Sequence, residues 1–206
     1  MPITAQSLYL TTNDLLSKNA GVTIGTSEFG RYITLVSNDL FDELRGAKNL
    51  NKAVYGRNRT LDNRLNPFRA RETLTFSSNI AVKPPTSAQI LSIITAAGLK
   101  VVPTDEDREA NIIADPLADD IYYVEEATQL RIVKGVATTT NIRYLKYPIT
   151  ILGTHTLAGR VPTLTETLEW DKNMEQELIN RLMAQFGTSM KDQFVTQVAN
   201  TNKAQE

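Results

Sequence analysis

The chain contains no cysteine and a single histidine, His155. The absence of cysteine excludes disulfides, thiolate metal ligands and cysteine nucleophiles together, and it does not identify a cellular compartment. One histidine cannot build a multi-histidine metal site. A lone general base needs a positioned partner, and the surrounding sequence GTHTLAGR offers none. We therefore expect His155 to be an ordinary loop or strand-end residue.

An excess of charge of one sign is also lacking, because 22 Lys and Arg stand against 23 Asp and Glu. A net charge of −1 argues against a general binder of nucleic acid or of membrane surfaces. No apolar run approaches the ~20 residues that span a bilayer. The N-terminal MPITAQSLYL lacks the basic and then apolar pattern of a signal peptide. We expect a soluble protein made in the cytoplasm.

The usual catalytic and phosphate-binding motifs are missing as well. The sequence has no P-loop, no dinucleotide-binding glycine pattern, no nucleophile elbow and no zinc motif. The only residues that could suggest catalysis are Asp and Glu side chains that belong to no recognisable motif. We therefore predict a protein that is not an enzyme and that has no cofactor and no metal site.

A long amphipathic helix is the strongest positive signal. From Thr26 to Leu44 the apolar residues recur at three- and four-residue steps, which indicates a helix lying on a core. This stripe consists of Phe29, Ile33, Val36, Leu40 and Leu44. Thr26 or Ser27 is a suitable N-cap, and Gly46 is a residue that commonly ends a helix. A helix over residues 5–18 precedes it, so we expect an N-terminal helix pair (5–18 and 27–45).

The middle of the chain is predicted to be rich in strands. Residues 73–82 and 99–103 read as strands, and residues 88–97 fit either a buried strand or a short helix, with β-branched residues favouring the strand. Three further segments are expected to form a small antiparallel meander whose last two strands make a hairpin. These segments are residues 121–124, 129–133 and 142–145. Residues 149–163 carry turn signals and are predicted to be a loop.

The C-terminal part returns to helical spacing. Residues 165–185 are predicted to be a helix, which Gly187 breaks, and a second apolar stripe follows. The stripe consists of Met190, Phe194, Val195 and Val198. It either packs as core or lies in a partner's groove. The predicted fold class is thus α+β: one domain over residues 1–187, with a helix pair, a β region (73–150) and a helix (166–186), and a C-terminal helical arm over residues 188–206.

Two segments of opposite charge stand out. Between Arg45 and Arg71 eight basic residues face one acid, Asp62. They are Arg45, Lys48, Lys52, Arg57, Arg59, Arg64, Arg69 and Arg71. This basic segment is either a solvated loop or a surface that meets phosphate or an acidic partner. Its aromatic residues are few, so stacking on bases is not expected.

Between Asp105 and Glu126 nine acids face one base, Arg108. They are Asp105, Glu106, Asp107, Glu109, Asp115, Asp119, Asp120, Glu125 and Glu126. The acidic segment contains no glycine and does not have the ligand spacing of an EF-hand. A solvated or partner-facing surface is therefore favoured over a metal or catalytic site.

Three stretches together resemble a known family. They are SEFGRYITLVSNDLFDELRG (27–46), NIRYLKYPITI (141–151) and LEWDKNMEQELINRLMAQFGTSMKDQFVTQVAN (168–200). They resemble head–tail connector proteins of tailed bacteriophages, similar to those of short-tailed crAss-like and other Bacteroidetes phages. The second stretch contains the strand signature Tyr144, Leu145, Lys146, Tyr147, Pro148.

The resemblance implies an adaptor in the virion. Such proteins form a homo-oligomeric, dodecameric ring that docks under the portal protein, meets a downstream tail protein and lines part of the DNA channel without sequence recognition. By this resemblance Met190, Phe194, Val195 and Val198 contact the portal, and no catalytic residues are implied.

The two charged segments fit a ring, because a ring closes through two different surfaces on each copy. We expect the basic segment of one copy to face the acidic segment of the next, or else the acids to line the channel and repel DNA. Two alternatives stay open. One is another tail or head-completion component of a virion, and the other is a small nucleic-acid-binding module that uses residues 45–71.

Overall fold

The structure, a computed structural model, describes residues 2–54, 63–115, 120–153, 155–157 and 162–187. The chain forms two compact units. One comprises residues 1–67 and 148–206 and is called the helical unit; the other, Phe68–Tyr147, is called the β unit. The β unit is thus inserted into the helical unit. The predicted boundary between a domain and an arm falls after residue 187, where the described residues end.

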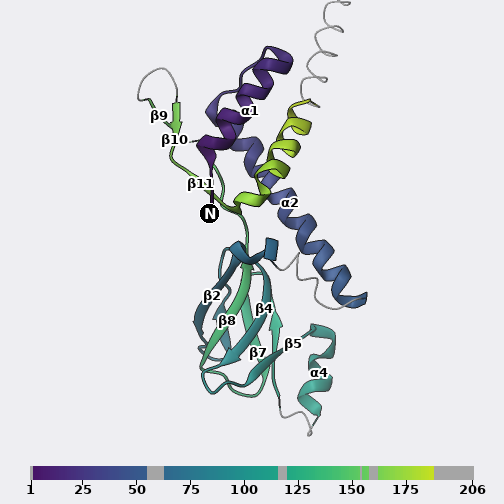
Figure 1. The fold of residues 1–206 in the computed structure, drawn as a ribbon. Helices are drawn as coiled ribbons and strands as arrows, with labels where there is room; N and C mark the ends of the chain where they lie inside the picture. Colours follow the sequence, from purple (N-terminus) through teal and green to yellow (C-terminus); the bar gives the residue numbers. More distant parts are fainter. Residues whose placement is uncertain (1, 55–62, 116–119, 154, 158–161, 188–206) are drawn as a thin grey trace, which may run out of the picture. The chain divides into compact units, whose positions relative to one another are not determined.

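The helical unit combines helices with short strands (Figure 1). Its elements are β1 (Pro2–Thr4), α1 (Ala5–Ala20), α2 (Thr26–Val54), β9 (His155–Leu157), β10 (Pro162–Leu164), β11 (Thr167–Asp171), the 3₁₀ helix η2 (Lys172–Met174) and a helix over residues 175–187. Thr4 caps α1, since its Oγ1 accepts a hydrogen bond from the Ser7 N–H at 3.2 Å. Gly21 ends α1 in the left-handed conformation, φ 66°.

Helix α2 buries the predicted apolar stripe but is longer than predicted. Phe29, Ile33 and Leu40 are fully buried, and Val36 and Leu44 nearly so. The expected end at Gly46 is wrong, because α2 continues to Val54. Glycine inside a helix costs only about 1 kcal/mol relative to alanine. That is too little to end a helix that is anchored by a buried stripe and continues into alanine, lysine and leucine residues.

The segment from Pro148 to Gly153 runs along α2 in an extended form. Thr34 Oγ1 accepts a hydrogen bond from the Ile151 N–H at 2.9 Å and donates one to the Ile151 carbonyl at 3.3 Å. The backbone of this segment comes close to the backbone of α2 where Gly153 meets Gly30. A Cβ atom on Gly30 would lie 2.6 Å from the Gly153 nitrogen. The predicted loop over residues 149–163 is wrong in part, because β9 and β10 within and beside it pair antiparallel. His155 begins β9, and its side chain lies outside the described part.

The predicted helix over residues 165–185 is also wrong at its start. Thr167–Asp171 is the strand β11, which pairs antiparallel with β1, with Leu168 opposite Ile3. Leu168 and Trp170 are both buried, and two apolar residues at i and i+2 followed by others fit a strand as well as a helix. The pairing with β1, more than 160 residues away, decided the outcome. Further along, Leu178, Leu182 and Phe186 are buried at helical spacing, as expected.

The β unit is built on one sheet of seven strands in the order β2-β8-β4-β5-β6-β7-β3. Its elements are β2 (Arg69–Thr75), β3 (Ile80–Val82), β4 (Ser87–Thr95), β5 (Lys100–Thr104), α4 (Glu106–Ala114), β6 (Ile121–Glu125), β7 (Gln129–Lys134) and β8 (Thr139–Lys146). The 3₁₀ helix η1 (Asn66–Phe68) leads into β2. The sheet is mixed, since β5 and β6 are parallel and α4 connects them. The edge strands β2 and β3 follow one another through a tight turn, so the sheet is nearly closed.

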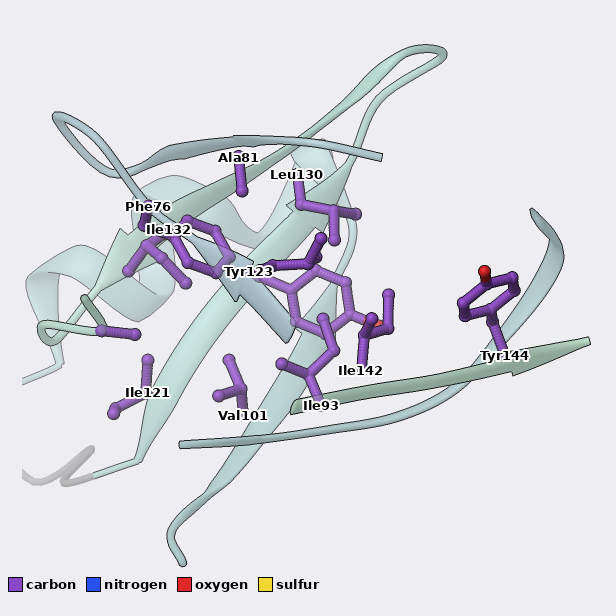
Figure 2. Close-up of a cluster of buried hydrophobic side chains, with 12 residues drawn as sticks. Phe76, Ala81, Ile93, Val101, Ile121, Tyr123, Leu130, Ile132, Ile142 and Tyr144 are labelled. Carbon is purple, nitrogen blue, oxygen red and sulfur yellow. The ribbon is translucent and has the colours of Figure 1, made fainter. Parts of the chain in front are cut away.

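The sheet encloses the apolar core of the β unit (Figure 2). Ile93, Leu130 and Ile142 are fully buried and come from β4, β7 and β8. Tyr123 of β6 lies among them, and burial raises the pKa of its phenol to about 12. Buried residues alternate with less buried ones along β7, at Leu130 and Ile132. The strands predicted over 121–124, 129–133 and 142–145 rested on such alternation or on apolar runs rich in β-branched residues.

The predicted fold class is nevertheless wrong. The middle of the chain is not a small antiparallel meander between two helix pairs but a seven-stranded mixed sheet that contains a helix. The predicted hairpin of β7 and β8 does not form, because β8 pairs with β2 and β4 while β7 pairs with β6 and β3. Local patterns identify strands, but strand neighbours are set by long-range packing.

Candidate functional site

The acidic segment folds into α4, a helix that the sequence analysis did not predict. Its first turn holds Glu106, Asp107 and Glu109, a favourable position for acids near the positive end of the helix dipole. None of its residues is buried, and Ile113 is 57% exposed. Helix α4 therefore lacks the apolar stripe by which an amphipathic helix is recognised and packed.

Polar contacts with Arg131 of β7 hold α4 to the sheet instead. The Arg131 guanidinium donates two hydrogen bonds to Glu109, Nη1 to Oε1 at 2.7 Å and Nη2 to Oε2 at 2.9 Å, and its Nε donates to Glu126 at 2.9 Å. The hydrogen bond from Arg131 holds the pKa of Glu109 below its usual value of 4.5. Hydrogen bonds from Gln129 and then Arg131 lower the pKa of Glu126, and those to Glu109 and Glu126 raise the pKa of Arg131.

Two lysines complete this network. Lys134 Nζ donates to the carbonyl of Ile112 at 3.1 Å and to that of Asp115, so a cation stands at the negative end of α4. Lys83 Nζ forms an ion pair with Glu125. Three of the nine acids, Glu109, Glu125 and Glu126, are therefore engaged inside the β unit by Arg131 and Lys83.

The acids at the start of α4 are different. Asp105 stands at the N-cap position, yet its side chain makes no capping hydrogen bond. Asp105, Glu106 and Asp107 are exposed, and among the described residues their carboxylates have no hydrogen-bond or ion-pair partner. Asp120, just before β6, is exposed as well, whereas Asp119 lies outside the described residues. We call Asp105, Glu106 and Asp107 the acidic turn.

The basic segment is divided over several elements. Arg45 on α2 pairs with Asp42 at 2.9 Å, and Arg64 lies 3.6 Å from Glu177. Lys48 and Lys52 belong to α2, but their side chains are outside the described part, as are residues Arg57 and Arg59. Arg69 and Arg71 are on β2. Residues 45–71 are thus not one loop.

Strand β2 brings Arg71 opposite an arginine that the sequence analysis did not select, Arg143 of β8. The Phe76 N–H donates a hydrogen bond to the Thr138 carbonyl at 2.8 Å. Because hydrogen-bonded and non-hydrogen-bonded pairs alternate along antiparallel strands, the even-numbered residues of β2 form the hydrogen-bonded pairs with β8. Arg71 and Arg143 are therefore a non-hydrogen-bonded pair, with Cα atoms about 4.5 Å apart and side chains on the same face. Both are exposed, and neither has an ion-pair or hydrogen-bond partner among the described residues. We call Arg71 and Arg143 the arginine pair.

No carboxylate neutralises the arginine pair within its own part of the sheet. The three neighbouring strands β2, β8 and β4 contain four basic residues and one acid, Glu72. Glu72 projects to the other face of β2 and accepts a hydrogen bond from the Tyr144 hydroxyl at 3.3 Å. Like charges directly opposite each other destabilise a sheet. The stability of the β unit therefore does not explain why two arginines occupy these positions.

Other predicted sites lie beyond what the structure describes. The four residues expected to contact the portal, Met190, Phe194, Val195 and Val198, belong to residues 188–206, outside the described part. Within the described residues, no group of three or more His, Asp or Glu side chains is arranged to hold a metal ion. The described helices include none that is long and apolar enough to cross a membrane.

No protein-family model matches the chain, and no curated protein matches its sequence.

Proposed function

We propose that this protein is a subunit of the head-to-tail adaptor ring of a tailed bacteriophage. In this role it docks under the portal protein, meets a tail protein on its other side and forms part of the channel through which DNA passes. It acts through its surfaces, as a virion structural component, and not as an enzyme. The portal contact is assigned to Met190, Phe194, Val195 and Val198.

One observation carries the proposal: parts of all three stretches that resemble connector proteins meet at α2. Trp170 is fully buried, and its Nε1–H donates to Ser37 Oγ at 2.6 Å. Arg181 binds Glu43 at 2.7 Å and Glu177 at 3.2 Å. Ile151, at the end of the second stretch, is hydrogen-bonded to Thr34.

The contacts of Ile151, Trp170 and Arg181 with α2 join segments more than 100 residues apart in the sequence, so parts of all three stretches lie together in the helical unit, while residues 141–147 of the second stretch belong to the β unit. The two oppositely charged flanks of the β unit also support the proposal, because a closed ring requires two complementary surfaces on each copy.

Imaging of the purified full chain, alone and mixed with the portal protein of the same virus, tests the proposal. We expect closed rings, on one face of the portal where both proteins are present. A chain that stays monomeric in both preparations would overturn the proposed function.

The assignment of the portal contact is tested by a variant carrying Phe194→Asp and Val198→Asp. We expect the variant to form rings that no longer bind the portal, since buried apolar anchors dominate such contacts. Asn200→Asp adds a charge nearby and serves as the control, with portal binding retained.

A further inference from the structure

Resting on the proposed ring, we propose that the β units of neighbouring copies bind one another head to tail. The arginine pair of one copy, Arg71 and Arg143, receives the acidic turn of the next copy, Asp105, Glu106 and Asp107. The occupant of the arginine surface is thus a second copy of this chain.

The arginine pair has the chemistry of a carboxylate receptor. Two guanidinium groups project side by side from adjacent strands, each exposed and unpartnered among the described residues. Planar guanidinium groups bind carboxylates through paired hydrogen bonds, as Arg131 does with Glu109 in the same unit. A carboxylate between Arg71 and Arg143 would relieve their mutual repulsion.

The acidic turn has the matching form. Its three carboxylates are consecutive and exposed, and the N-cap side chain of Asp105 is not used by its own helix. The helix behind it is held to the sheet by hydrogen bonds from Arg131 and Lys134. The turn is therefore a fixed acidic projection rather than a flexible charged tail, which lowers the conformational entropy lost on binding.

The two surfaces lie on opposite flanks of the β unit and toward the same end of the sheet. Figure 1 shows α4 on the flank away from β2 and β8, in agreement with the strand order. Strands β2, β8, β4 and β5 are successively antiparallel, so the start of β2 and the end of β5 lie at one end. Arg71 is the third residue of β2, and Asp105 follows β5 directly. Contacts at one level on opposite flanks add copies side by side, and such head-to-tail contacts form a ring when the rotation from copy to copy closes.

A second copy fits the arginine pair better than DNA does. From Phe68 to Tyr147 the sequence has nine Lys and Arg and ten Asp and Glu, a balance of −1. With this balance of charges, the acidic side chains of the unit repel the phosphates of a DNA duplex about as strongly as its basic side chains attract them. The arginine pair is the exception and offers a local attraction. The same unit carries an acidic surface that is complementary to those arginines.

Charge reversal tests the contact by sedimentation of the full chain, with the portal protein present. Arg71→Glu with Arg143→Glu keeps a like-charged pair on β2 and β8, so its effect on folding is small. We expect this variant to raise the protein concentration of half-assembly at least about tenfold. Asp105→Lys with Asp107→Lys has the same expected effect, and Asp105→Asn with Asp107→Asn is a milder form in case lysine disturbs α4. A chain with both reversals is expected to assemble again.

Lys100→Glu, an exposed charge reversal on β5 away from both surfaces, is the matched control and should assemble like the unsubstituted chain. If the arginine variant assembles normally, or if the double reversal does no better than either single one, the contact is wrong while the ring stands. Loss of DNA binding by the arginine variant with assembly unchanged would reassign the pair to DNA. No assembly of the unsubstituted chain would overturn the ring itself.

Discussion

Arg71 and Arg143 face each other on an exposed surface, and neither has an acidic partner among the residues that the structure describes. A sheet selected only for stability would place an opposite charge at one of these positions. We therefore expect these two residues to affect the stability of the β unit and the proposed binding of an anionic group in opposite ways. A substitution that raises the stability should weaken the binding.

Arg71→Glu alone should stabilise the protein while weakening its assembly. The new glutamate would stand directly opposite Arg143, and an opposite-charge pair across strands contributes about 0.2–1 kcal/mol. Urea unfolding of the single variant measures this gain. Thr75→Glu, opposite Thr139, introduces the same residue without an arginine partner and should give no gain. A loss of stability in Arg71→Glu would contradict the expectation.

Gly153 lies where the helical unit leaves no room for a Cβ atom. Its φ is +68°, and a Cβ there would lie 2.1 Å from the Thr26 carbonyl oxygen. We expect Gly153→Ala to destabilise the protein by about 2–5 kcal/mol, since backbone strain and overpacking add. Gly21 has φ +66° with no atom within 4 Å of such a Cβ. Gly21→Ala should therefore cost only about 1–2 kcal/mol in thermal unfolding, and equal losses would refute the steric argument.

Among the elements, α4 depends most on ionisation. Its docking rests on Glu109 and Arg131 instead of on buried side chains. The pKa of Glu109 is lowered in the folded protein, so the docking free energy is fully present above pH 4.5 and is lost as the pH falls through the lowered value. The core around Ile142 has no such dependence.

We therefore expect acid to release α4 before the sheet unfolds. Carbon-13 Cα shifts of residues 106–114 should lose their helical values below pH 4.5, while those of β8 persist. Glu109→Gln should loosen α4 already at neutral pH, and Glu106→Gln, whose carboxylate has no partner in the described part of the chain, should have a much smaller effect. Simultaneous loss of α4 and β8 signals would show that the helix is not independently held.

The elements also show how far the sequence predicts this fold. Strands with alternating buried residues were found because burial on one face leaves a local pattern, as in Gln129 to Val133, where Leu130 and Ile132 are buried. Helix α4 left no such pattern, since ion pairs hold it and Arg131 lies 22 residues from Glu109. Only one part of the candidate site could be predicted from the sequence, for the same reason. Arg71 belongs to a basic segment that the sequence shows, but its position opposite Arg143 depends on the register between β2 and β8, which the sequence does not show.

For the whole molecule, the division into two units is the main consequence of the fold. The β unit has its own core, and its ends lie on paired strands, with Arg69 opposite Leu145. The chain thus leaves and rejoins the helical unit at one end of the sheet. Each unit has the means to fold by itself.

Residues 68–147 expressed alone should unfold in one cooperative thermal transition, as small domains with a single core do. The complementary chain, with residue 67 joined to residue 148 through a short glycine-serine linker, should retain the helical content of α1 and α2. Circular dichroism of both proteins checks this. A fragment that melts without cooperativity would show that the sheet needs the rest of the chain.

The insertion between Pro67 and Pro148 has a genetic consequence. One uninterrupted stretch of coding DNA specifies the entire β unit, so two crossovers, one on each side, would replace it in a single exchange. If the proposed adaptor function holds, related viruses that swap this stretch would inherit a new neighbour-recognising module while the residues gathered on α2 stay unchanged, and the two parts of the gene would diverge at different rates.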